Sequence, residues 1–114
     1  MIYVPIVLFT IAAAGGLTLV IIKLNGKGLP WPLVIGHGIF AASGLMALII
    51  NVFQNTQNFL MNLALVLFLI VAIGGFTVLS FHLRKKKQPN SLILVHGAAA
   101  VISFILLIIA SGYR

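Results

Sequence analysis

Four long apolar stretches take up most of the chain, and this feature restricts its fold more than any other. They run over residues 2–22, 33–53, 59–81 and 92–110, each close to the roughly 20 residues that a helix needs to cross a bilayer. Only 6% of the 114 residues are charged, so a small water-soluble fold could not bury the apolar surface that remains. The sequence therefore predicts an all-α bundle of four transmembrane helices, forming a single membrane domain over residues 1–114.

The basic residues predict how this bundle lies in the membrane. Six of the seven fall in the connectors at residues 23–32 and 82–91, and Arg114 ends the chain. Lysine and arginine concentrate in cytoplasmic loops, so we expect both connectors in the cytoplasm and both termini outside, together with the uncharged connector at residues 54–58. The basic residues therefore indicate how a multi-pass protein is oriented in the lipid bilayer, and they do not indicate binding to nucleic acid.

The two halves of the sequence match each other at an offset of 59 residues. From Val7 to Ile50, 18 of 44 positions are identical to their counterparts without a gap. This match predicts a tandem duplication, with repeat 1 at about residues 1–55 and repeat 2 at about residues 58–114. Because each repeat is an αα-hairpin with two spans, the repeats would be parallel and related by a pseudo-twofold axis along the membrane normal.

Several kinds of chemistry are excluded by residues that the chain lacks. It contains no Asp, Glu or Cys, which removes carboxylate pairs, thiolate nucleophiles, disulfides and cysteine-bound metals. The chain resembles the small multidrug transporters in its length and its four spans. Those proteins depend on a glutamate within the first helix, and this chain has none, so transport is disfavoured.

Two histidines within the predicted spans are the main candidates for a functional site. His37 and His96 lie 59 residues apart, in the second and fourth spans, which are diagonal in an up-and-down bundle. Ionisable residues are costly within a membrane and usually face the bundle interior. At 100° per residue, small residues share a helix face with each histidine. They are Ala41 and Gly44 beside His37, and Ala100 and Ser103 beside His96.

Paired glycines lie at the same predicted depth as the histidines. Counting 1.5 Å per residue from the helix ends places Gly16 roughly 10 Å deep and His37 roughly 8 Å deep. A planar macrocycle held between helices needs two opposed imidazoles, and small residues where it approaches the backbone. The sequence has both features in each half, with glycine pairs at Gly15, Gly16, Gly74 and Gly75.

This arrangement resembles the membrane b-type cytochromes, in which histidines from different helices of a four-helix core hold haem. The resemblance covers architecture and ligand placement. It implies one haem b with His37 and His96 as axial ligands, glycine pairs that admit the ring, and a function as a small electron carrier. A quinone is a further cofactor that such a carrier would use.

Other interpretations of the same residues remain open. The histidines could serve only as hydrogen-bonding residues between helices, with the glycine pairs as ordinary packing sites. The imidazoles could also bind chlorophyll-type magnesium or copper. An alternative function is a non-catalytic accessory subunit of a larger membrane complex, binding pigment or lipid. Its partners would be other membrane subunits or further copies of this chain.

Overall fold

A computed structural model of the chain describes residues 3–54, 58–87 and 89–112, which form four helices and no strand. The helices are α1 (Tyr3–Leu24), α2 (Trp31–Gln54), α3 (Phe59–Leu83) and α4 (Asn90–Ser111). Every observed boundary lies within two residues of the expected one. All four helices are long and apolar enough to cross a membrane, and the longest dimension of the molecule is 44 Å, about the full thickness of a bilayer. The predicted all-α, four-helix fold is confirmed.

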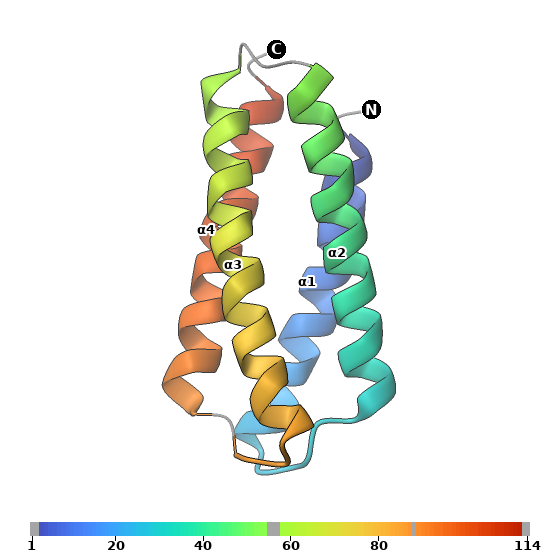
Figure 1. Cartoon of the computed structure of the whole chain (residues 1–114), viewed down its shortest axis with the longest axis vertical. Coiled ribbons are helices and arrows are strands. Elements are labelled where there is room, and N and C mark those ends of the chain that lie inside the picture. Colours follow the sequence, from blue (N-terminus) through green and yellow to red (C-terminus); the bar gives the residue numbers. More distant parts are fainter. Residues whose placement is uncertain (1–2, 55–57, 88, 113–114) are drawn as a thin grey trace.

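The helices form two hairpins that lie side by side (Figure 1). α1 packs along α2 and α3 along α4, whereas the contacts of α1 with α4 and of α2 with α3 are less extensive. The diagonal helix pairs have no Cα atoms within 8 Å of each other in the described residues. Both basic connectors lie at one end, which we call the basic end, and the start of α1 and the end of α4 lie at the opposite end. The side of the membrane that each end occupies remains a prediction.

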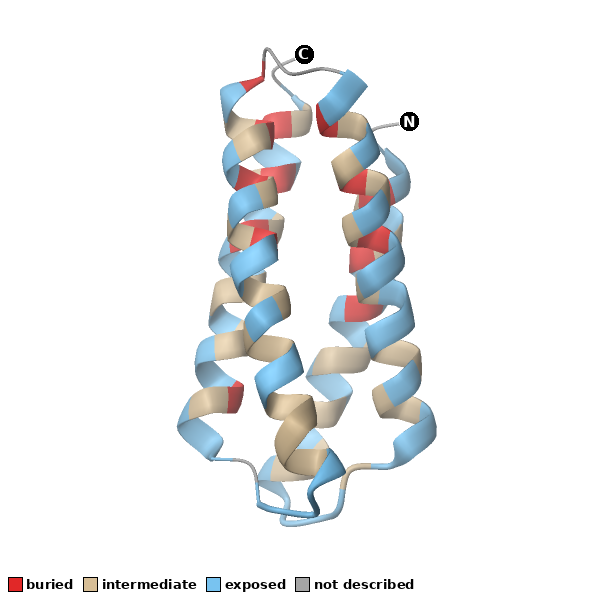
Figure 2. Cartoon of the chain, viewed as in Figure 1, coloured by how far each residue is buried: buried red, intermediate tan, exposed pale blue. Residues whose placement is uncertain are grey.

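The hydrophobic core lies in the half of the bundle away from the basic end (Figure 2). Phe9 and Phe68, which are 59 residues apart, stack across the two hairpins with their ring centroids 4.1 Å apart. Within the described residues of the ranges 13–43 and 69–102, Ile93 is the only buried residue. The hairpins are therefore packed together at one end and much less so at the basic end. The core consists of Phe9, Leu48, Val52, Met61, Ala64, Phe68, Leu107 and Ala110.

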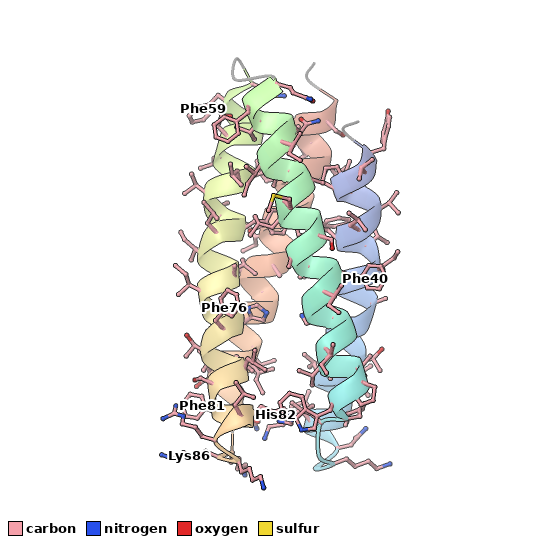
Figure 3. The ribbon with its side chains drawn as sticks, turned by 45° about the vertical axis from the view of Figure 1, so that its right-hand side comes forward. Phe40, Phe59, Phe76, Phe81, His82 and Lys86 are labelled. Atoms are coloured by element: carbon pink, nitrogen blue, oxygen red, sulfur yellow. The ribbon has the colours of Figure 1, made fainter. Side chains whose placement is uncertain are left out.

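The outer surface of the bundle is strongly apolar. Phe59 is 72% exposed and Phe76 69% exposed, and both, like Phe40, extend outward from the helices (Figure 3). Contiguous apolar surface of this kind is rare on soluble monomers, but acyl chains solvate it readily. The surface therefore agrees with lipid as the surrounding medium.

Both basic connectors begin with the same turn. Gly26 has φ +76° and Lys85, 59 residues later, has φ +56°. The N–H group of each donates to the carbonyl three residues earlier, at Lys23 and His82 respectively. Glycine adopts this left-handed conformation freely, whereas a side chain such as that of lysine makes it unfavourable. The duplication itself remains a prediction, although positions 59 apart have matching local structures here.

Replacing Lys85 by Gly should stabilise the protein by about 0.5–1 kcal/mol. Relief of the left-handed strain outweighs the additional backbone entropy that glycine brings to the unfolded chain. The measurement is reversible unfolding in detergent micelles. The control is Lys87→Gly, which removes the same charge from the same connector without a positive φ. Equal stability of the two variants would contradict the assignment of strain to Lys85.

Candidate functional site

The His37 ring lies against α1 at the first glycine pair. Its Nδ1 is 2.7 Å from the carbonyl oxygen of Ala12. A carbonyl can only accept a hydrogen bond, so Nδ1 carries the proton and donates it. A Cβ atom built on Gly16 would lie 2.9 Å from Cε1 of His37, and one on Gly15 would lie 3.5 Å from its Cβ. The absence of side chains at Gly15 and Gly16 therefore lets the imidazole approach α1 and reach the carbonyl.

His96 occupies the corresponding place in the second hairpin. A Cβ atom would lie 3.1 Å from Cε1 of His96 if built on Gly75, and 3.4 Å from its Nδ1 if built on Gly74. The backbone of Val71, 59 residues after Ala12, interacts with the ring. However, Nδ1 of His96 is buried and makes no hydrogen bond of normal length and angle. The two histidines have the same setting, but His96 lacks the close hydrogen bond that His37 makes.

The two imidazoles lie in different hairpins. They belong to α2 and α4, which are diagonal, and each is partly buried. Among the residues that the structure describes, the Nε2 atom of neither ring has a hydrogen-bond partner. With Nδ1 of His37 donating to a carbonyl, Nε2 of that ring keeps an available lone pair, which is the form that binds a metal ion.

The remaining predicted site residues divide between two environments. Ala41 and Ala100 are partly buried. Gly44 is buried in the packed half, where a Cβ atom would lie 3.0 Å from the ring of Phe9. Ser103 is 1% exposed, and its hydroxyl donates to the carbonyl of Ala99. The structure therefore brings the four glycines of the pairs together with the histidines, and it places Gly44 and Ser103 within the packed half. Roles of these residues in binding a ring remain predictions.

One contact near the site had no counterpart among the sequence predictions. Trp31, at the start of α2, lies against His82, near the end of α3, with ring centroids 4.2 Å apart. His82 matches Lys23 in the repeat alignment, so the repeat pattern gave no signal for a ring contact. This contact connects the two hairpins at the basic end, where other packing between them is sparse.

The ligand types and the comparisons limit what the site can be. The described part of the chain holds no cluster of three or more His, Cys, Asp or Glu side chains, whereas structural zinc sites use four such ligands. Known protein families, curated proteins and solved structures give no significant match to this chain. What the fold and site define is a multi-pass, four-helix membrane protein with a pair of histidines inside the bundle.

Replacing Gly16 by Ala should displace the His37 ring and weaken its hydrogen bond to Ala12. We expect a loss of stability of about 1 kcal/mol, the magnitude of a hydrogen bond between membrane helices. The measurements are unfolding in micelles and the ¹⁵N chemical shift of His37 Nδ1. The control is Gly38→Ala, where a Cβ atom would meet nothing within 4 Å and alanine should be neutral or stabilising. Identical behaviour of the two variants would contradict this role for Gly16.

Proposed function

We propose that the protein is a small b-type cytochrome-like electron carrier of the membrane, which holds one haem between α2 and α4. His37 and His96 would hold its iron. The observation that carries this proposal is the position of the two imidazoles, whose unpartnered Nε2 atoms lie in the half of the bundle where almost nothing is buried.

The hydrogen bond of His37 supports a role as ligand. Histidines that bind metals usually donate their second ring N–H to a carbonyl or carboxylate, which fixes the orientation of the ring. The bond from Nδ1 to Ala12 is of this kind. In the second hairpin the backbone of Val71, which corresponds to Ala12, lies near the His96 ring. A small movement of that ring would complete an equivalent hydrogen bond.

The packing of the basic half also supports the proposal. Its interior-facing residues are only partly buried, although native bundles normally pack their interiors to crystal density. Gly15, Gly16, Gly74 and Gly75 let the two imidazoles lie close to the backbones of α1 and α3. Haem would supply reversible one-electron chemistry. Two imidazole ligands would leave no position for oxygen, and the surrounding apolar helices would exclude water.

Duplication and orientation complete the proposal. A duplicated hairpin would place equivalent histidines on diagonal helices, so one sequence element would provide both ligands. Matching contacts at Phe9 and Phe68, and matching turns at Gly26 and Lys85, support this origin. The basic end would face the cytoplasm, as expected for a lysine-rich end. Electrons would then pass to or from a quinone or a neighbouring redox subunit.

A second candidate function is that of an accessory subunit without a cofactor. It is favoured by the hydrogen bond of His37, which satisfies Nδ1 without any ligand, and by the exposed apolar residues on every helix, which include Phe53 at 78%. In this case each histidine would join the two helices of its hairpin. Stable co-purification with other membrane proteins, without a bound chromophore, would support this function.

An absorption spectrum of the purified protein tests the first proposal. We expect a Soret band together with the reduced α and β bands of six-coordinate haem. Either His37→Ala or His96→Ala should abolish the six-coordinate spectrum, because each removes one axial ligand. His82→Phe, which removes the third histidine, should leave the spectrum unchanged. Circular dichroism and gel filtration would establish that each variant is folded. A protein that is colourless after expression with haem supplied, or a band that survives both alanine variants, would refute the proposal.

A further inference from the structure

Two adjoining cavities lie at the basic end, between the connectors of the two hairpins. Their volumes are about 450 Å³ and about 310 Å³. Lys23, Lys27 and Lys87 line both of them, and Lys85 and Lys86 line the smaller one as well. The lysines come from both connectors, so the cavities depend on how the two hairpins are placed together. Figure 3 shows Lys86 and His82 at this end of the bundle.

No acidic side chain of the protein neutralises the positive charge of these cavities. Five lysines line them, and the whole chain contains no Asp or Glu. Like charges brought close together repel each other unless an anion lies between them. Arg84 belongs to the same basic run but lines neither cavity. It donates instead to Ser80 and lies over the ring of Phe81.

His82 lines the smaller cavity together with Trp31. The two rings pack against each other, with their centroids 4.2 Å apart. The Nε2 atom of His82 is buried, so the ring forms part of the wall and the lysines supply the attraction for an anion.

We propose that these two cavities bind the headgroup of an anionic membrane lipid that carries two phosphates. The site lies at the ends of helices that span the membrane, and Trp31 in its wall is the kind of residue that lies at headgroup level. Lysine binds phosphate as a compact point charge. Because Lys23, Lys27 and Lys87 line both cavities, they can contact a phosphate in either one. The site uses neither His37 nor His96.

The test measures binding of the purified full-length protein to nanodiscs of defined composition. The probes are cardiolipin, which has two phosphates, and phosphatidylglycerol at equal total charge, both in phosphatidylcholine. We expect tighter binding of cardiolipin. Each lysine near a membrane surface strengthens binding to an anionic lipid about fivefold. Lys87→Gln should therefore weaken cardiolipin binding about fivefold, and the double variant Lys27→Gln, Lys87→Gln should weaken it roughly 25-fold. Arg84→Gln removes the same charge from the same connector, and it should weaken binding less than about twofold.

Three results would overturn the proposal. Equal losses for Lys87→Gln and Arg84→Gln would indicate diffuse surface charge instead of a site. Equal affinity for the two lipids at matched charge would remove the requirement for two phosphates. Inorganic pyrophosphate that binds in detergent as tightly as cardiolipin would indicate a soluble ligand. A His37→Ala, His96→Ala double variant should bind cardiolipin normally. The lipid proposal would therefore stand even if the haem proposal failed.

Discussion

Helices in a bilayer gain little by burying apolar side chains against each other, because lipid is as apolar as the helix surface, so they associate through close packing and polar contacts. The contact of His37 with Gly15, Gly16 and the Ala12 carbonyl provides both within one hairpin. The glycines let two helix backbones approach, and the imidazole adds a hydrogen bond between the helices. His96 repeats the packing against Gly74 and Gly75. Each hairpin is thus held together by its own histidine and glycine pair.

The association between hairpins depends on a different region. The stack of Phe9 on Phe68 and the packing of Leu48 and Leu107 lie in the half near the termini. Asn58 acts at the same end but within the second hairpin, since its side chain donates to the carbonyl of Ala110 in α4 and also caps the start of α3. Buried packing between the hairpins is therefore concentrated in the half near the termini, and at the basic end the contact of Trp31 with His82 connects them. This distribution lets the basic half remain loosely packed while the molecule stays assembled.

Elements that depend on composition and chain geometry could be predicted from the sequence. Apolar length set the four spans, and Pro30 and Pro89 marked the starts of α2 and α4 because proline suits the beginning of a helix. Periodicity predicted that Gly44 and Ser103 share the helix faces of the histidines. Periodicity could not show that Phe9 packs against Gly44, because it gives the side of the helix on which a residue lies and not the residue that it contacts. The Ala12 carbonyl could not be predicted as the hydrogen-bond acceptor for His37, because every residue has a backbone carbonyl.

The difference between the two histidines bears on their role. If hydrogen bonding between helices were their only function, both rings would be expected to complete the bond that His37 makes, because a buried unpaired Nδ1 costs about 1–3 kcal/mol. His96 is held in the same glycine setting without that bond. Completing the bond to the Val71 backbone would remove this cost. Ligation at Nε2 would draw electron density from the ring and make Nδ1 a stronger donor toward Val71. Both candidate functions therefore call for the same hydrogen bond at Nδ1 of His96, and what separates them is whether Nε2 binds a ligand.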